Sequence, residues 1–247
     1  MPKGGSSKKK YTYIWVSAVV LLFGIFTVVE ITKRLEKGTL VDNNRLAGAR
    51  MTEELSFIVN NGQKRKVPGF SFMNQDSVRV TEKDYLGKVY VVDFFFTTCP
   101  TICPTMTRNL VELQDTFKDN PDFGAASFTI NPRYDRPNVL KKYAAKYGIV
   151  NPNWHLLTGA QDSIYTLAQE GFYIVANEDP DAPGGFEHSG MFALVDKKGY
   201  LRSRTDAYGN PMIYYRGTIT EEQGVNNAGE SQQITMLKED IQKLLSE

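Results

Sequence analysis

Hydrophobic residues are distributed very unevenly along the chain. An almost unbroken apolar run extends from Tyr13 to Val29, and a charged and polar stretch follows it over 32–54. The run is about as long as the shortest segments that span a bilayer, roughly 17–25 residues. We therefore expect a basic cytoplasmic leader over residues 1–12, a transmembrane anchor over 13–31, a tether over 32–54 and one folded domain over 55–247.

Two other interpretations of the apolar run fit less well. A cleaved signal peptide would need a small-x-small cleavage site, and the residues after the run, Glu30–Arg34, offer none. A buried core helix is disfavoured by the lysines that precede the run, at positions 3, 8, 9 and 10. These lysines favour a cytoplasmic N-terminus, which would place the folded domain on the outer side of the membrane. The leader lacks the arginine-rich pattern of a mitochondrial transit peptide, so we expect a bacterial inner membrane and a periplasmic domain.

Beyond position 55 the pattern is that of a layered α/β domain. Residues 88–96 are almost all β-branched or aromatic, which is typical of a central strand covered on both faces. In the stretch 100–117 apolar residues recur at helical spacing, so a helix is expected directly after this strand. Further strands are predicted at 67–72, 77–80, 125–130, 154–157, 191–196 and 200–202, and further helices at 136–147, 160–170 and 232–245. Strands that alternate with helices and end in a hairpin predict a mixed sheet flanked by helices. The polar stretch 217–230 is expected to be a loop.

Composition and charge change this picture little. The chain is 41% hydrophobic and 23% charged, which is ordinary for a globular protein. The formal net charge is +1, so no nucleic-acid partner is expected.

The chemistry of the chain centres on its two cysteines. Cys99 and Cys103 lie four positions apart, at the predicted junction between the central strand and the following helix. A structural disulfide is a weak interpretation, because so small a loop gains less than the ~3 kcal/mol expected for a loop of about 15 residues. A helix N-terminus also lowers the pKa of a thiol, which favours a reactive pair. At helical spacing the two thiols can form a reversible disulfide or bind one soft metal ion, and the residues alone leave both alternatives open.

The chain has two histidines that could add a ligand. His155 lies within a predicted strand and is expected to be structural. His188 follows the loop 179–187 and precedes a predicted strand, a junction that can present a side chain toward the cysteines. From its position alone, His188 is equally compatible with a third metal ligand and with a solvated loop residue.

Several segments resemble one known family. Cys99-Pro100-Thr101-Ile102-Cys103-Pro104 is similar to the CPxxCP signature of the Sco/SenC copper-assembly proteins. The segments 127–137, 154–159 and 187–199 resemble other motifs of that family, so the resemblance covers about residues 66–246. Asn131 departs from it, since the family usually has aspartate there, and the region 203–217 is longer than usual.

The resemblance implies a thioredoxin-like fold in which Cys99, Cys103 and His188 bind one copper ion. It implies a metallochaperone that helps to assemble the binuclear copper site of cytochrome c oxidase subunit II. The alternative is a membrane-tethered thiol–disulfide oxidoreductase, which a thioredoxin-like reductant could regenerate. In that case Cys99 would be the nucleophile and Cys103 the resolving thiol.

Overall fold

The N-terminal part of the chain forms a single long helix. The computed structural model describes residues 7–36, 55–206, 208 and 210–247, grouped in two compact units, Met1–Gly48 and Ala49–Glu247. In the first unit, α1 (Ser7–Glu36) runs for 30 residues. Its large apolar side chains between 14 and 28 are exposed, and Trp15 is 72% exposed. None of the helices, within the residues described, is both long enough and apolar enough to cross a membrane. Residues 1–6 of the predicted leader and 37–54 of the predicted tether lie outside the described residues.

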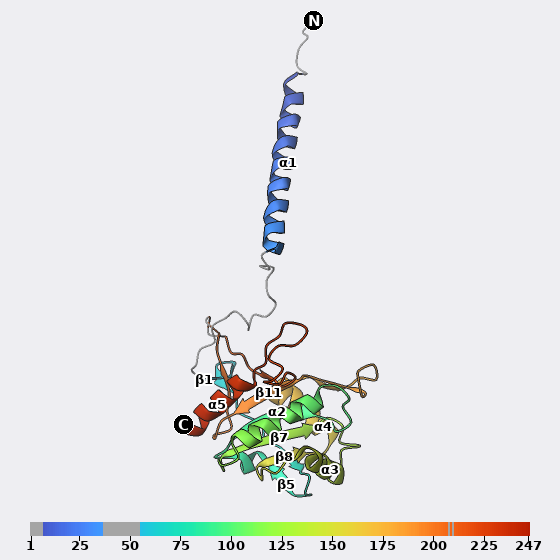
Figure 1. Cartoon of the computed structure of the whole chain (residues 1–247), viewed down its shortest axis with the longest axis vertical. Coiled ribbons are helices and arrows are strands. Elements are labelled where there is room, and N and C mark those ends of the chain that lie inside the picture. Colours follow the sequence, from blue (N-terminus) through green and yellow to red (C-terminus); the bar gives the residue numbers. More distant parts are fainter. Residues whose placement is uncertain (1–6, 37–54, 207, 209) are drawn as a thin grey trace. The chain divides into compact units, whose positions relative to one another are not determined.

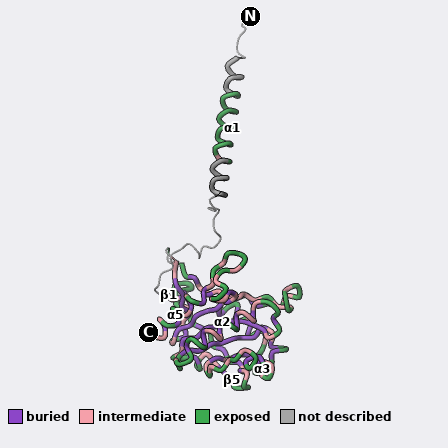
Figure 2. The backbone as a smooth tube through the Cα atoms, viewed as in Figure 1, coloured by how far each residue is buried: buried purple, intermediate pink, exposed green. Residues whose placement is uncertain are grey.

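The second unit is built on a mixed sheet, shown in Figure 1. The order of its strands is β1 (Leu55–Phe57), β12 (Leu201–Arg204), β11 (Met191–Val195), β6 (Val89–Phe95), β7 (Phe123–Thr129) and β8 (Trp154–Leu157), and β13 (Tyr215–Arg216) also pairs with β11. β6, β7 and β8 are parallel, and the pairs β6–β11, β11–β12 and β12–β1 are antiparallel. Every residue of β6 and β7 is buried, as expected for central strands (Figure 2).

Helices and short hairpins cover the two faces of this sheet. The helices are α2 (Cys103–Thr116), α3 (Pro137–Tyr147), α4 (Gln161–Thr166) with the π-helical turn η2 (Leu167–Gly171), α5 (Ile234–Ser246) and the 3₁₀ turn η1 (Glu82–Tyr85). The hairpins are β2 (Val59–Asn60) with β3 (Gln63–Lys64), β4 (Ser71–Met73) with β5 (Arg79–Thr81), and β9 (Ala176–Glu178) with β10 (Phe186–His188). α2 packs against α3, α5 and the sheet. On the opposite face Phe94 contacts Phe172, and Phe128 packs against Phe70 and Phe72 of the β4 segment.

The alternating strands and helices confirm the predicted layered α/β architecture. Two of the differences from the expectation bear on the site. The helix after the central strand begins at Cys103 and not near Pro100, so Cys99 lies in the preceding loop. The stretch 179–187 is not a loop throughout, because Phe186 and Glu187 belong to β10, which pairs with β9. His188 is the last residue of that strand.

The region after β12 returns to the sheet beside β10. β13 pairs with β11, and the Gly217 N–H donates to the Gly190 carbonyl at 2.7 Å. Asn109 of α2 donates its amide N–H groups to the Gly217 and Ile219 carbonyls. The beginning of the predicted 217–230 loop is therefore fixed against α2, next to the strand that follows His188.

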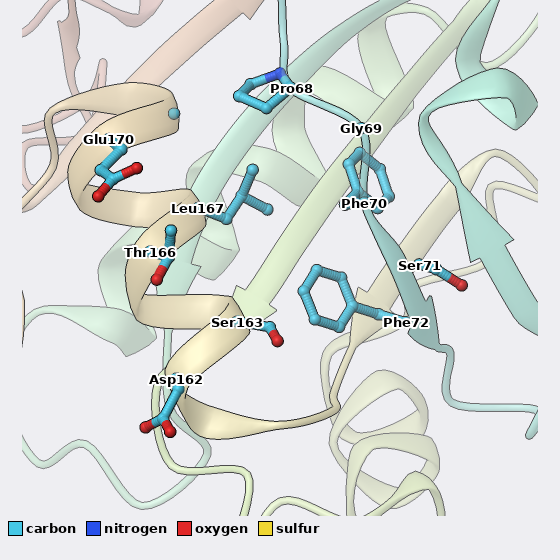
Figure 3. A pocket seen from close by; sticks show the side chains of 11 residues that line it. Pro68, Gly69, Phe70, Ser71, Phe72, Asp162, Ser163, Thr166, Leu167 and Glu170 are labelled. Carbon is cyan, nitrogen blue, oxygen red and sulfur yellow. The ribbon is translucent and has the colours of Figure 1, made fainter.

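A cavity of about 670 Å³ opens on the face of the sheet that carries β4 and α4. Figure 3 shows Phe72 and Leu167 facing each other across it. Its lining includes Pro68, Ser71 and Glu170, and neither cysteine nor His188 takes part. This cavity is thus separate from the predicted thiol site.

Candidate metal centre

The two cysteines and His188 meet at the end of the central strand. The loop that carries Cys99 follows β6 directly, and Cys103 is the first residue of α2. Pro100 disfavours a helical conformation of Cys99, since the residue before a proline is driven toward extended backbone. Cys99 is 8% exposed and Cys103 1% exposed, so Cys99 is the more accessible thiol.

His188 reaches the sulfur atoms from the β9–β10 hairpin. Its Nε2 lies 3.2 Å from the Cys103 Sγ and 3.9 Å from the Cys99 Sγ. Phe96 makes an edge contact with the imidazole ring, with ring centroids 5.6 Å apart. The hairpin is held close by Gly184, whose φ is +83°. A Cβ there would lie 2.8 Å from Phe96 and 3.1 Å from Pro100, so the loop passes closely over the cysteine segment.

The three donor atoms have the spacing of one metal site. The two Sγ atoms and Nε2 lie within 4.8 Å of one another, and both cysteines are free thiols. A trigonal site with metal–ligand bonds of about 2.0–2.3 Å places its donors about 3.5–4.0 Å apart, because the side of the triangle is √3 times the bond length. The two Nε2–Sγ distances, 3.2 Å and 3.9 Å, are close to this spacing, so the donor set suits a single soft metal ion. The Nδ1 of His188 is buried and has no hydrogen-bond partner among the described residues.

The two thiols differ in their proton affinity. The hydrogen bond from the Cys103 thiol, aided by His188 and nearby backbone N–H groups, lowers the pKa of Cys99 to about 3 despite partial burial. Burial raises the pKa of Cys103, and the neighbouring Cys99 thiolate raises it further. The pair thus holds one thiolate, at Cys99, and one proton, on Cys103. At Cys103 desolvation outweighs the lowering of a thiol's pKa that is expected near a helix N-terminus.

Two further carboxylates lie behind the thiols. Asp93 of β6 is buried, and burial raises its pKa to about 7, against the opposing effects of a hydrogen bond with Ser127 and the charge of His188. Asp135 accepts hydrogen bonds from the backbone N–H and hydroxyl of Thr97, two residues before Cys99. Neither carboxylate was predicted from the sequence to belong to the site. The position of Asp93 inside an otherwise apolar strand was the one available signal.

The other residues considered from the sequence are not among the three metal-donor residues. His155 is partly buried against the Tyr85 ring, and its Nδ1 lies 3.3 Å from the Asn74 amide. This confirms its expected structural role. Asn131 accepts hydrogen bonds at its backbone carbonyl from the Tyr134 and Asp135 N–H groups, and it is not a member of the three-residue donor group.

Comparison with known proteins places this arrangement in a family. A family model described as SCO1/SenC matches residues 59–218, well over half of the chain. The chain belongs to the SCO1/SenC family. It is 38% identical over 136 residues to the SCO1 protein homolog of Bacillus subtilis (strain 168), and the match covers 54% of this chain and 70% of the relative.

Solved structures of Sco proteins share the fold. BsSco, described as having a disulfide switch and as a member of the Sco family of cytochrome c oxidase assembly proteins, aligns with a TM-score of 0.56 at 30% identity, covering 74% of this chain and 94% of that chain. ScoI of Bradyrhizobium japonicum, solved with copper bound, aligns with a TM-score of 0.54, covering 73% of this chain and 99% of that chain. At 21% identity the second likeness is one of fold. The mixed sheet and these neighbours confirm the predicted thioredoxin-like fold.

Proposed function

We propose that this protein is a copper-delivery protein that carries one copper ion on Cys99, Cys103 and His188. The observation that supports this most directly is the group of two sulfur atoms and one imidazole nitrogen within 4.8 Å. Soft thiolate ligands select Cu(I), and the imidazole nitrogen also suits the harder Cu(II). Membership of the SCO1/SenC family supports the same assignment.

The protonation states of the two thiols determine how copper can bind. Thiols bind metals as thiolates, so metal binding must remove the proton held by Cys103. Cys99 is already ionised at neutral pH, which makes it the first ligand for an incoming ion. Pro100 and Thr101 beside it are exposed, so a partner can approach from this side and exchange ligands one at a time. We propose that copper leaves along the same route.

The proposed recipient is the binuclear copper site of cytochrome c oxidase subunit II. BsSco, to which this chain is 30% identical, is described as one of the cytochrome c oxidase assembly proteins. We further propose that α1 anchors the protein in a bacterial inner membrane, with the copper-binding domain on the periplasmic side. The lysines before the apolar run and the exposure of its large side chains, such as Phe23 and Phe26, support this topology.

A second candidate function is thiol–disulfide exchange, which the low pKa of Cys99 favours. The Cys99 thiolate would attack a target disulfide, forming a mixed disulfide and releasing one target thiolate. Cys103, once deprotonated, would attack the Cys99 sulfur, releasing the second target thiolate and leaving a Cys99–Cys103 disulfide. The two electrons gained by the target come from the cysteine pair, and a thioredoxin-like reductant would restore them. His188 forms no bond in these steps and contributes only to the low pKa of Cys99.

Substitution of each histidine separates the two functions. Copper affinity of the reduced full-length protein is measured by competition with a chromophoric Cu(I) chelator, for the wild type, His188→Ala and His155→Ala. Copper delivery predicts one ion per chain for the wild type. It also predicts a loss of affinity of roughly 100-fold or more in His188→Ala, because loss of a ligand should cost at least as much as loss of an outer-shell partner, which typically costs about 10–100-fold. His155→Ala is the matched control and should retain wild-type affinity. Absence of stoichiometric binding by the wild type, or equal affinities of the wild type and His188→Ala, would contradict the proposal.

A further inference from the structure

The three proposed ligands are held by separate parts of the chain. Cys103 belongs to α2, where the Met106 N–H donates to the Ile102 carbonyl in the first turn of the helix. His188 is paired with Ala176 in the β9–β10 hairpin. Cys99 lies in an irregular loop, and its backbone N–H donates at 3.2 Å to the Phe96 carbonyl. The position of Cys99 therefore depends on what holds this loop.

A single buried carboxylate bonds to the loop. Asp135 is fully buried, and its Oδ2 accepts from the Thr97 N–H at 3.0 Å, while its Oδ1 accepts from the Thr97 hydroxyl. The Thr129 hydroxyl, at the end of β7, donates to the same Oδ2 at 2.5 Å. The Asp135 N–H donates in turn to the Asn131 carbonyl, which fixes the carboxylate to the β7–α3 turn. Hydrogen bonds are electrostatically stronger in the protein interior than in water, so a buried carboxylate that accepts several of them holds its donors in a fixed geometry.

We propose that Asp135 is a positioning residue for copper binding, which acts through Thr97 to hold the Cys99 sulfur at the distance that the metal requires. This inference rests on the proposed function. Thr97 is two residues before Cys99, so a rotation of the loop at Thr97 moves the Cys99 Sγ relative to Cys103 and His188. Preorganised ligands bind more tightly, because the protein does not have to order them when the ligand arrives.

The two threonines provide a matched pair of substitutions. Both donate a hydroxyl to Asp135, and a change to valine removes that donor with almost no change in shape. Only Thr97 lies in the Cys99 loop. The Thr129 hydroxyl additionally accepts from the Asn131 N–H at 3.1 Å, so Thr129→Val loses at least as many hydrogen bonds as Thr97→Val. If the Asp135 carboxylate only stabilises the fold, Thr129→Val should therefore lower the Cu(I) affinity at least as much as Thr97→Val does.

The test compares Thr97→Val, Thr129→Val and the conservative Thr97→Ser in the reduced full-length protein. Cu(I) affinity is measured by competition with a chromophoric chelator, and the urea midpoint of unfolding is measured on the same samples. We expect Thr97→Val to bind Cu(I) roughly tenfold more weakly, equivalent to about 1.4 kcal/mol. Thr129→Val and Thr97→Ser should stay within about twofold of the wild type. Equal weakening in both valine variants, or no weakening in Thr97→Val, would overturn the proposal.

A measurement without metal keeps this inference distinct from the proposed function. In a Cys103→Ser background, Cys99 is the one remaining thiol of the chain. We expect Thr97→Val to raise the rate of its reaction with iodoacetamide roughly fivefold, and Thr129→Val to leave the rate unchanged, because release of the loop exposes the sulfur. If the wild type binds no copper but this difference is observed, copper delivery fails while positioning of Cys99 stands. If the two rates are equal, the positioning role fails.

Discussion

Asp93 allows a quantitative prediction about the pH dependence of stability. Its side chain is 1% exposed in the central strand β6, and its Oδ1 has no hydrogen-bond partner among the described residues. Burial raises its pKa to about 7, and the Ser127 hydroxyl and the charge of His188 oppose this only in part. The folded protein therefore holds the Asp93 proton over a pH range in which an unfolded chain, with a carboxyl pKa near ~3.9, has released it.

The sign of the effect follows from this difference in bound protons. Because the folded state binds the proton more tightly, the contribution of Asp93 to stability is complete below about pH 4 and is lost as the pH rises to about 7. The slope is about 1.4 kcal/mol per pH unit, and the pKa interval of about three units gives a total loss of roughly 4 kcal/mol. An amide side chain cannot ionise, so in the Asp93→Asn variant this loss should disappear.

The measurement is urea unfolding between pH 4 and 8, followed by the fluorescence of the buried Trp154. We expect the free energy of unfolding of Asp93→Asn, relative to the wild type, to rise by several kcal/mol between pH 4 and 7 and to level off above. Because the other carboxylates titrate in both proteins, their contribution cancels in the difference between the two free energies of unfolding. Asp181→Asn, at an exposed loop position, is the control and should show a constant difference. The reasoning is refuted if the Asp93→Asn difference also stays constant with pH.

Two further predictions concern the thiols and the C-terminal helix. Because Cys99 is ionised and Cys103 protonated, metal-free reduced protein should show the absorbance of one thiolate near 240 nm, constant from about pH 5 to 8. The Cys99→Ser variant should lack this absorbance. An absorbance that rises tenfold per pH unit would contradict the low pKa of Cys99. Asp240 is buried and accepts from Arg204 at 2.8 Å and from the Tyr215 hydroxyl at 2.8 Å, so Asp240→Asn should cost roughly 3–5 kcal/mol in urea unfolding. Asp76→Asn, which removes the exposed ion pair with Lys141, should cost less than about 1 kcal/mol, and equal losses in the two variants would refute the argument.

Much of the fold and the two thiols could be predicted from local patterns. The strand β6, apolar except for Asp93, and the Cys-Pro-x-x-Cys-Pro segment are properties of neighbouring residues, so the sequence alone displays them. The start of α2 was misplaced because the apolar periodicity extends back to Ile102, while Pro100 keeps Cys99 out of the helical region. Asp135 was missed because its importance depends on Thr97, 38 positions earlier in the chain.

The position of His188 shows why the third ligand was harder to predict than the thiols. The strands β9 and β10 have three residues each and lack alternation, and a stretch rich in proline, glycine and aspartate separates them. Nothing local distinguishes such a segment from a solvated loop. Their pairing is decided by tertiary contacts, among them the packing of Phe186 on Phe96 at 5.1 Å between ring centroids. Tertiary contacts of this kind bring Nε2 to the sulfur atoms.

The arrangement of the site also constrains how the two candidate functions relate. Both use the Cys99 and Cys103 sulfurs, so a Cys99–Cys103 disulfide and the proposed copper complex exclude each other on one molecule. A chain that has just reduced a target is oxidised, and it must be reduced again before it can accept copper. His188 distinguishes the two states, because it offers a nitrogen ligand to the metal but forms no bond during disulfide exchange. Reduction of a recipient and delivery of copper to it would therefore require two successive binding events between the recipient and this protein, or two copies of this protein, one with reduced thiols and one with bound copper.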